Sequence, residues 1–438
     1  MSTRDGLDWS NWGGTAQWRV CRVAVPASEE ELVTELRRAA SDGHRVKPLG
    51  ASHSFTGVAA TDGVQVRLDR LQGVIRVDAT QGVATVPAGT TLSRLNTALA
   101  AHGLALPNLG DIDRQSLAGA LATGTHGTGL ALRGLSAGVR ALRIVLADGS
   151  VRVCSPTVEP DLFAAARLGL GALGIITELT VEVVPAFLLR AHERPEPLLG
   201  LLEGLDEQID GHDHFEFYWF PHTDRTQTKR NNRVPTGTEA APLPGWRRRL
   251  DDDLLSNGLF EVTNRVSTRV PRLTGPINEV AARALTEREY VDSSHRVFVT
   301  DRRVRFAEAE WAFPRHALTE VLLELRAWID AHDEQISFPV ECRVAAADDV
   351  WLSTAYERES CYIAIHRFHR QNGGRYFEAF ESLARAHGGR PHWGKLHDCD
   401  ADYFRSVYPR FDDFLAVREA VDPDRHFANR YLDRVLGP

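Results

Sequence analysis

The chain has 438 residues, which is too long for one comfortable hydrophobic core and indicates two or three domains. Hydrophobic residues make up 43% of it and charged residues 25%, which is close to the average of soluble globular proteins and excludes a disordered chain, a collagen-like fibre and a disulfide-dense miniprotein. A formal net charge of -8 without a long basic run argues against a nucleic-acid partner.

Neither a secretory leader nor a membrane span is expected from the sequence. The first residues, MSTRDGLDWSNWGG, lack the uninterrupted apolar stretch of a signal peptide, and no later segment holds 18 apolar residues free of charge. The five cysteines are odd in number and form no CxxC pair, which argues against a disulfide framework or a zinc ribbon. We therefore expect a cytoplasmic protein with reduced thiols and no membrane anchor.

Lysine is rare in this chain. Only Lys47, Lys229 and Lys395 are lysines, and the remaining basic positions apart from histidine are arginine. A GC-rich genome would account for that bias, so the arginines carry no functional weight. A retained lysine, in contrast, can mark a site that needs a compact, titratable ammonium group.

The first 185 residues alternate short helices and strands, which predicts an α+β domain. Residues 28–42 begin with a serine and an acidic turn before apolar residues at helical spacing, as in a capped helix. A strand then leads into the turn of RVKPLGASHSFTG, a second strand covers VQVRLDRL, and VIRVDATQGVATVPAG forms a hairpin at Gln81-Gly82. TLSRLNTALAAHG is expected to be a helix that ends at Gly103, and VRALRIVLADGSVRVCS a hairpin across Asp148-Gly149.

A GxGxxG match occurs at residues 169–174, within a predicted helix PDLFAAARLGLGALG that precedes the strand GIITELTVEVV. Such a match suggests a dinucleotide site when it follows a strand and opens a helix. Here the glycines close a helix and precede a strand. A helix-to-strand turn with close backbone approach is therefore favoured over a Rossmann site, and that turn could still touch a cofactor.

Near Pro185 the pattern changes, which predicts domains at residues 1–185 and 186–438, with the C-terminal tail packing back on the first. HFEFYWFPHTD reads as an aromatic strand, and residues 223–258 are polar, arginine-rich and expected to be mostly loop. HALTEVLLELRAWIDAHD predicts a helix, and ISFPVECRVAA and CYIAIHRFH predict strands. The absence of a repeat of 20–50 residues excludes solenoids and propellers.

Two glycine-rich segments of the first domain are candidates for cofactor binding. Gly50 to Phe55, GASHSF, places small residues and hydroxyls in a turn after a strand, where consecutive backbone N–H groups can face a pyrophosphate. An ordinary surface turn is the alternative. In QSLAGALATGTHGTG a small-residue helix leads into a loop of glycines and threonines around one histidine, which suits contact with a flat ligand. Together the two loops favour a large phosphorylated cofactor.

The second half carries candidate catalytic side chains. Glu341 and Arg343 are two residues apart on a predicted strand, so they share a face, and a structural ion pair is the alternative to a catalytic pair. His366 lies on the next predicted strand, and RPHWGKLH brings Lys395 beside two histidines. The histidine spacing is wrong for a helical zinc pair and no third ligand is indicated, so no metal is expected.

At these residues the chain resembles an aldonolactone oxidoreductase of the vanillyl-alcohol-oxidase flavoprotein superfamily, a group of sugar-1,4-lactone oxidases and dehydrogenases with alditol oxidases as close relatives. The resemblance is essentially full length. It rests on six segments in order: GASHSF, QSLAGALATGTHGTG, HFEFYWFPHTD, VECRVAAADDVWLSTAY, RPHWGKLH and DPDRHFANRYLDRVLG. It implies an α+β fold, with a two-subdomain FAD-binding domain and an α+β substrate domain over the flavin.

The resemblance also implies how FAD is held. His53 matches the histidine that carries a covalent flavin in many members, and the second loop lacks the cysteine of doubly attached relatives, so a single link is expected. The pyrophosphate would lie on Gly50, Ala51, Ser52, His53 and Ser54. The flavin would be lined by Gly110, Ser116, Gly124, Thr125, His126 and Gly127, and Ile175 or Ile176 would contact the adenine half.

Finally, the resemblance implies oxidation of a secondary alcohol of L-gulono-, L-galactono- or D-arabinono-1,4-lactone by hydride transfer to flavin N5. Arg343 and Lys395 would stabilise the negative charge that develops on the flavin, Glu341 would orient a substrate hydroxyl, and His366 would be a base or a flavin neighbour. Ser116 matches a position that reaches substrate in alditol-oxidising relatives. HRFH departs from their HFTW-like pattern, so an alditol oxidase is the second interpretation.

Two further points stay open at this level. A carbohydrate-binding protein without catalysis is disfavoured, because the candidate catalytic residues and His53 are all present. The electron acceptor is oxygen or another soluble acceptor, and oxygen is favoured. Access of oxygen is expected to depend on the loop of residues 122–127, where Gly124 would admit it and a closely packed Thr125 would block it.

Overall fold

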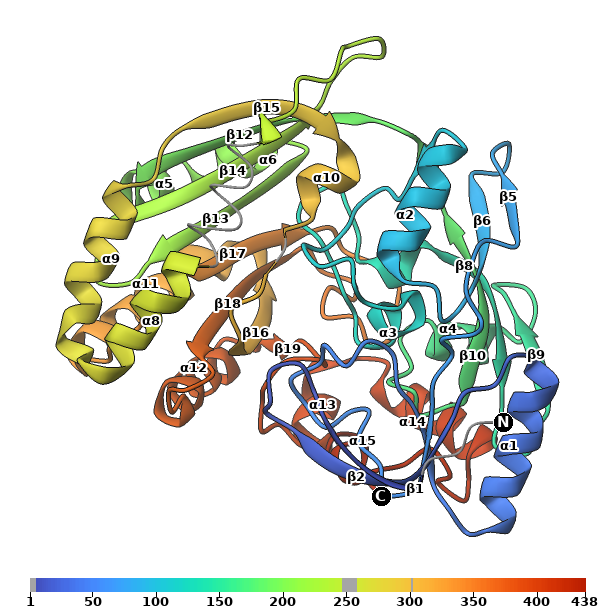
Figure 1. The fold of residues 1–438 in the computed structure, drawn as a ribbon. Helices are drawn as coiled ribbons and strands as arrows, with labels where there is room; N and C mark the ends of the chain where they lie inside the picture. The colour runs from blue at the N-terminus through green and yellow to red at the C-terminus, as the bar shows by residue number, and fades with distance from the viewer. Residues whose placement is uncertain (1–4, 246–257, 301) are drawn as a thin grey trace.

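The computed structural model describes residues 5–245, 258–300 and 302–438, which form an α+β protein as expected. In Figure 1 the blue N-terminal strands and the red C-terminal helices share the lower part of the molecule, and a large sheet of green, yellow and orange strands occupies the upper left. The described strands form four sheets, of four, five, two and eight strands.

The four-stranded sheet supports the first glycine-rich loop. Its order is β1-β2-β4-β3, with β4 parallel to both of its neighbours. Helix α1 covers it, and Ser28 accepts a hydrogen bond from the backbone N–H of Glu31 at its start, which confirms the predicted cap. The bounds are β1 (Asp5–Ser10), β2 (Gln17–Ala24), α1 (Glu29–Ser41), β3 (Val46–Pro48) and β4 (Val64–Val66).

The five-stranded sheet has the order β5-β6-β10-β8-β9 and is antiparallel throughout. Both predicted hairpins are confirmed, with Gly82 and Gly149 at positive φ in their turns. The elements of this part are β5 (Arg76–Asp78), β6 (Val83–Pro87), α2 (Leu92–Ala101), β7 (Leu104–Ala105), α3 (Leu117–Ala122), a 3-10 turn (Leu135–Gly138), β8 (Val139–Val145), β9 (Val151–Cys154), α4 (Pro160–Ala166), β10 (Ile175–Glu182) and β11 (Val184–Pro185).

The helix predicted over PDLFAAARLGLGALG is too long. Helix α4 ends at Ala166, and the chain then turns through Leu170 and Gly171, which have φ of 55° and 61°. A leucine in the left-handed region cannot continue a right-handed helix. The segment that matches GxGxxG is therefore an irregular turn that leads into β10, as its position before a strand suggested.

The eight-stranded sheet has the order β15-β12-β14-β13-β17-β18-β16-β19. Residues 223–258 were expected to be mostly loop, and this is wrong for their first part, because β14 pairs with both β12 and β13. Residues 246–257 lie outside the described residues. The strands are β12 (Leu188–Pro197), β13 (His214–Phe220), β14 (Arg225–Arg233), β15 (Arg288–Ser293), β16 (Phe306–Pro314), β17 (Val340–Ala345), β18 (Ser360–Phe368) and β19 (Arg390–Pro391).

Helices cover one face of this large sheet. Apolar side chains of α5, α6, α11 and α12 join the core that contains Phe217, Trp311 and Ile363. The helices of this half are α5 (Leu198–Glu203), α6 (Leu205–Asp210), α8 (Phe260–Arg269), α9 (Thr274–Arg283), α10 (Ser294–Phe298), α11 (Leu318–Ala331) and α12 (Gly374–Ala386), with 3-10 turns at Pro271–Leu273 and Arg315–Ala317.

The opposite face of the sheet is polar and yet largely buried. The register places Tyr218 beside Glu341, and both Glu341 and Glu310 opposite Ala364. Because side chains alternate along a strand, one face collects charged and polar groups from five adjacent strands. These groups are Lys229, Glu216, Tyr218, Glu341, Arg343, His366, Glu308 and Glu310. Charged residues are rarely buried in such numbers for stability alone, so this face is a candidate site.

The C-terminal segment packs against the N-terminal sheet (Figure 1). Its helices are α13 (Ala401–Val407), α14 (Phe411–Val421) and α15 (Arg430–Leu436). The Asn429 amide donates to the carbonyls of Gly57, Val58 and Ala60 at 3.0, 3.1 and 2.8 Å. Lys47 of β3 donates to the carbonyl of Phe427 at 3.2 Å and to that of Gly171 at 2.9 Å. The tail thus holds the segments on either side of the glycine-rich loop.

Candidate active site

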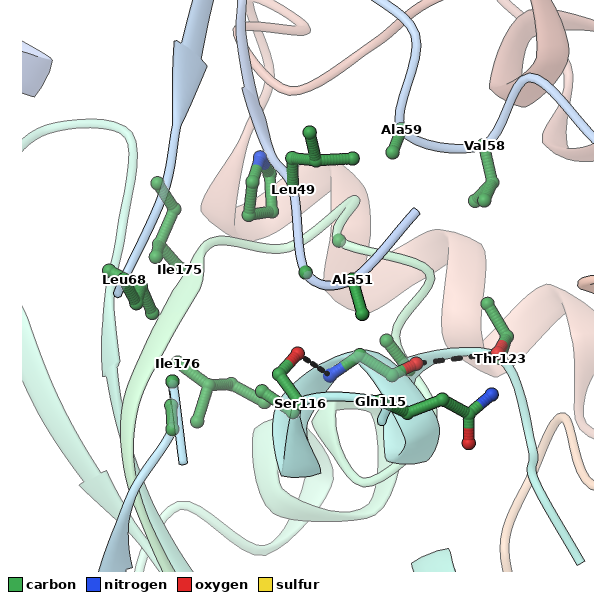
Figure 2. A pocket seen from close by; sticks show the side chains of 18 of the residues that line it. Leu49, Ala51, Val58, Ala59, Leu68, Gln115, Ser116, Thr123, Ile175 and Ile176 are labelled. Carbon is green, nitrogen blue, oxygen red and sulfur yellow. Dashed lines mark hydrogen bonds between the residues drawn. The ribbon is translucent and has the colours of Figure 1, made fainter. Parts of the chain in front are cut away.

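A cavity of about 400 Å³ lies between the loop after β3, helix α3 and the turn before β10 (Figure 2). Its volume is that of a small-molecule or cofactor site. In Figure 2 Ile175 and Ile176 lie on one side, and Ala51 lies across from Ser116 and Gln115. Eight of the residues predicted to bind the cofactor line it: Gly50, Ala51, Ser52, His53, Ser54, Ser116, Ile175 and Ile176.

The loop from Gly50 to Ser54 has the properties of an anion-binding cradle. In the described part of the chain, its backbone N–H groups donate to no backbone carbonyl, which leaves them available to a ligand. A Cβ at Gly50 would collide with Ser116 Oγ, so only glycine allows the loop to approach helix α3 this closely. The residues present therefore fit a long, phosphorylated cofactor such as FAD.

Ser116 begins helix α3 at this contact. Its hydroxyl accepts a hydrogen bond from the backbone N–H of Gly119 at 3.3 Å, which Figure 2 shows as a dashed line. This is N-cap geometry. Ser116 therefore has a structural role at the cavity wall in addition to any contact with a ligand.

His53 lies at the end of the cradle that faces Lys395. Burial lowers the pKa of its imidazole, and the charges of Lys395 and Arg114 lower it further. The loop that carries Lys395 is fastened to the segment after His53, because the backbone N–H of Phe55 donates to the carbonyl of Gly394 at 2.6 Å. The cavity and the polar face of the sheet therefore meet at this point.

Glu341 and Arg343 form an ion pair on β17, which confirms that the two share a face. Arg343 Nε also donates to Glu216 Oε2 at 2.9 Å, and Arg343 Nη2 lies 3.7 Å from Asp111 Oδ2. Arg302 pairs with the same Asp111 carboxylate and lies 3.6 Å from Glu341 Oε2. Burial opposes ionisation of Asp111, but Arg302 and Arg343 outweigh it and hold its pKa well below the usual range. Asp111, in the segment that precedes helix α3, thus makes charged contacts with both arginines.

Tyr218 and Lys229 extend this network along the sheet. The Tyr218 hydroxyl lies 3.1 Å from Glu216 Oε1 and 3.2 Å from Glu341 Oε1, and Lys229 Nζ lies 3.1 Å from Glu216 Oε1. Burial raises the pKa of Tyr218, and the charges of Glu216 and Glu341 raise it further, so the hydroxyl stays protonated and acts as a donor.

Lys395 belongs to a second group of charges beside the first. Its ammonium lies 2.5 Å from Glu308 Oε2 and 4.0 Å from Glu310 Oε2. His366 Nε2 lies 3.5 Å from Glu308 Oε1, and His126 Nε2 lies 3.2 Å from Glu310 Oε1. The structure therefore brings the four predicted catalytic residues, Glu341, Arg343, Lys395 and His366, to one face of one sheet.

Five residues predicted to line the flavin lie outside the cavity lining: Gly110, Gly124, Thr125, His126 and Gly127. Thr125 Oγ1 lies 3.4 Å from Gln115 Oε1, and a Cβ at Gly124 would press on Leu168. The imidazole of His126 is stacked on Tyr362, with 3.7 Å between ring centroids. The sequence did not anticipate this contact with the large sheet.

Several residues of the site were not singled out from the sequence: Asp111, Glu216, Tyr218, Arg302, Glu308 and Glu310. Two signals could have found most of them. Glu216 and Tyr218 alternate with aromatic residues in HFEFYWF, and Glu308 and Glu310 alternate with apolar ones in FAEAEWAF, so both strands present a polar face. Lys229 was noted for the rarity of lysine, and it takes part in the site.

Within residues 5–245, 258–300 and 302–438, no helix is long and apolar enough to cross a membrane. The same residues contain no group of three or more histidine, cysteine, aspartate or glutamate side chains placed to hold a metal ion.

Two family models match the chain. The family described as D-arabinono-1,4-lactone oxidase matches residues 179–435, and the family described as FAD binding domain matches residues 21–155. The first covers more than half of the chain and includes every strand of the large sheet, and the second includes the cradle of residues 50–54.

Curated relatives match over nearly the whole chain. L-gulono-1,4-lactone dehydrogenase of Mycobacterium tuberculosis is 41% identical over 430 residues, which are 98% of this chain and 99% of the relative. L-gulonolactone oxidase of Mus musculus is 35% identical over 98% of both chains. Alditol oxidase of a Streptomyces species is more distant, at 30% identity over 98% of both chains.

Among solved structures, cholesterol oxidase from Brevibacterium sterolicum has the same fold, with a TM-score of 0.84 at 18% sequence identity over 100% of this chain and 97% of the other. The cradle, the charged sheet face and the full-length matches agree with one another. The chain therefore belongs to the D-arabinono-1,4-lactone oxidase family, and it is an FAD-dependent aldonolactone oxidoreductase of the vanillyl-alcohol-oxidase type that acts on CH-OH donors.

Proposed function

We propose that the enzyme oxidises a secondary alcohol of an aldono-1,4-lactone of the L-gulono-1,4-lactone type, bound beside Glu341 and Arg343. The observation that carries this proposal is the balance of charge at the first network. Its three carboxylates, Asp111, Glu216 and Glu341, are matched by Arg302, Arg343 and Lys229. Such a surface offers many donors and acceptors without net charge, which suits a neutral ligand rich in hydroxyl groups.

FAD would lie in the cavity, with its pyrophosphate on the backbone N–H groups of Gly50 to Ser54. Ser116, Ile175 and Ile176 would contact the cofactor from the other walls, as their places in the cavity support. Gly110, Gly124, Thr125, His126 and Gly127 would line the flavin side. When bound, FAD accepts the hydride that leaves the substrate carbon.

The charged side chains have separate roles in this proposal. Arg343 and Lys395 supply positive charge where negative charge develops, and Glu341 accepts a hydrogen bond from a substrate hydroxyl and so orients the C–H bond. Nδ1 of His366 lies 3.3 Å from the carbonyl of Pro339, whereas Nε2 lies 3.5 Å from Glu308 and makes no hydrogen bond. His366 is therefore proposed as a base or as a neighbour of the flavin beside Glu308.

His53 is proposed to carry the flavin through one covalent bond. Its lowered pKa keeps the imidazole neutral, and a neutral nitrogen has the lone pair that bond formation requires. The alternative is that His53 only hydrogen-bonds the pyrophosphate.

Steady-state assays of L-gulono-1,4-lactone beside xylitol test the substrate. We expect a higher kcat/KM for the lactone, because a compact ring can meet Glu341, Arg343 and Tyr218 at once. The alditol oxidase relative makes a linear polyol the second candidate. A strong preference for xylitol would replace the lactone proposal with the alditol one.

Oxygen is proposed as the electron acceptor, as the sequence favoured. The relatives are named both dehydrogenase and oxidase, so their names support either acceptor. Enzyme reduced under anaerobic conditions and then mixed with aerated buffer should be reoxidised faster than it turns over, with hydrogen peroxide formed. Persistence of the reduced flavin would instead make a soluble carrier the acceptor.

A further inference from the structure

The second group of charges is centred on Lys395. The ammonium lies between two glutamates of β16, at 2.5 Å from Glu308 and 4.0 Å from Glu310. Because Glu308 and Glu310 are two residues apart on one strand, they point to the same face and offer the lysine two adjacent carboxylates.

Each of these two glutamates lies beside a histidine. Glu308 faces His366 Nε2 at 3.5 Å, and Glu310 faces His126 Nε2 at 3.2 Å. The other ring nitrogen of each histidine faces a backbone carbonyl, that of Pro339 at 3.3 Å and that of Gly127 at 2.9 Å. Each carboxylate of the group thus has one histidine beside it, and Nδ1 of each histidine faces a backbone carbonyl.

Among the five residues of this group, Lys395 is the one with a solvent-exposed side chain. The side chain of Lys395 is 21% exposed, whereas those of Glu308, Glu310, His126 and His366 are exposed by 8% or less. The ammonium also lies 5.3 Å from the centre of the Phe55 ring, beside the cradle that contains His53. This group of charges therefore exposes one ammonium beside the segment that follows His53, while its two carboxylates are buried.

We propose that Glu308 and Glu310 are positioning residues that fix Lys395 in place and keep it charged for the reaction, with His366 and His126 anchoring the two carboxylates. This inference deepens the proposed function and rests on the role given there to Lys395. Without the two carboxylates, a partly buried ammonium beside an apolar ring would lose its charge or turn toward solvent.

The surrounding charges agree with this role. Burial alone would lower the pKa of Lys395, but Glu308 and Glu310 outweigh it and raise the pKa, with a smaller contribution from Asp111. Among the described residues, Lys395 also influences His53 and His392, and burial lowers the pKa of both, that of His392 to about 4. Both are therefore neutral at physiological pH and do not oppose the ammonium.

The scarcity of lysine makes a direct test possible. Lysine labelled with 13C at Cε gives only three side-chain NMR signals, from Lys47, Lys229 and Lys395, and single Lys→Met variants assign them. In the purified holoenzyme without substrate, Lys395 should titrate above the ordinary value of about 10.4. Glu308→Gln should lower the pKa of Lys395 by about 1 to 3, because an opposite charge within 4 Å is lost. Glu310→Gln should lower it less, since that carboxylate is farther away.

Glu193→Gln is the matched control. Glu193 is a buried glutamate on the same sheet, but it pairs with Arg288 at 2.9 Å and influences Lys229 rather than Lys395. The control should move the Lys229 signal and leave that of Lys395 in place. If Lys395 titrates at or below its ordinary value in the wild type, or if Glu308→Gln leaves its pKa unchanged, the inference is wrong. The wild-type titration decides the matter even if the variant does not fold.

Kinetics then separate this inference from the proposed function. Glu308→Gln should lower kcat with little change in KM, and activity should begin to fall at a lower alkaline pH than in the wild type. Glu308→Asp, which keeps the carboxylate, should restore part of kcat and part of the alkaline pH limit. In a Lys395→Met background, Glu308→Gln should cost nothing further, whereas an independent structural role would give additive losses. An enzyme that does not oxidise lactones would contradict the proposed function and still leave the lysine titration as a test of this inference.

Discussion

At the scale of single residues, the site depends on charges that neutralise one another across strands. The sequence could predict that Glu341 and Arg343 share a face, because alternation on one strand needs no knowledge of its neighbours. It could not show that Arg343 also binds Glu216, which is 127 positions away, because that contact depends on the register between β13 and β17. For the same reason the sequence could not predict Asp111 as a site residue, because it contacts Arg302 and Arg343 only after the two halves of the chain pack together.

Arg343→Ala should lower the rate of flavin reduction more than it weakens lactone binding, if the guanidinium acts mainly on the developing charge. Loss of one such group costs about 3 kcal/mol, or on the order of a hundredfold in rate. Stopped-flow measurement of flavin absorbance with L-gulono-1,4-lactone separates the rate from the binding constant.

Arg230→Ala is the control for lost stability. Arg230 is a buried arginine on the opposite face of the same sheet and pairs with Glu196 at 2.9 Å. It should reduce stability but leave flavin reduction intact. An Arg343→Ala enzyme that is reduced at the wild-type rate would show that Glu341 and Arg343 form only a structural pair.

His53→Ala should leave FAD dissociable, with lower activity and a similar fold. The wild-type flavin should stay with the protein after acid or SDS denaturation, because a covalent bond survives the loss of tertiary structure. The check is flavin absorbance in the protein and filtrate fractions after denaturation. Flavin that washes off the wild type would contradict the assignment of His53 as the attachment point.

At the scale of elements, local turn chemistry was predictable and the effect of distant packing was not. The hairpins at Gln81-Gly82 and Asp148-Gly149 form as predicted, because glycine supplies the positive φ that such turns require. The helix predicted over residues 160–174 ends early, because its last part is hydrogen-bonded to a residue that is distant in the sequence. Lys47 donates to the carbonyl of Gly171 at 2.9 Å and that of Leu170 at 3.4 Å, and both carbonyls belong to the turn that lines the cavity.

Lys47→Met should destabilise the protein in a pH-dependent way. Burial, together with the charge of Arg418, lowers the pKa of Lys47 to about 7, whereas in the unfolded chain the pKa is about 10.4. Between these two values the unfolded state binds more protons, so the wild type gains stability as pH rises, by at most about 1.4 kcal/mol per pH unit. The variant loses this slope and also removes the hydrogen-bond donor to the carbonyls of Gly171 and Phe427.

Urea unfolding of both proteins from pH 7 to 9.5 checks this prediction. The stability difference between wild type and Lys47→Met should grow with pH over that range. A difference that stays constant would mean that Lys47 has a similar pKa in the folded and unfolded states, and that its three hydrogen bonds alone account for its effect.

At the scale of the whole molecule, the six ordered segments were sufficient to place the chain in its family and fold. They were not sufficient to show which residues of the large sheet the second glycine-rich loop contacts. The motif predicts that His126 lines the flavin, but it could not also show that the imidazole is stacked on Tyr362 and lies 3.2 Å from Glu310. The second glycine-rich loop lies between the FAD-binding part and the large sheet, and its position depends on contacts with both. A motif in the loop itself cannot predict which residues of the sheet it contacts.

The central claim is that the charged face of the large sheet and the FAD cavity act together on an aldono-1,4-lactone. Anaerobic mixing of the purified holoenzyme with L-gulono-1,4-lactone, followed by flavin absorbance, tests it most directly because no electron acceptor is needed. We expect the absorbance of oxidised flavin to disappear, quickly in the wild type and about a hundredfold more slowly in Arg343→Ala. A wild-type flavin that stays oxidised with the lactone, while dithionite reduces it, would contradict the claim.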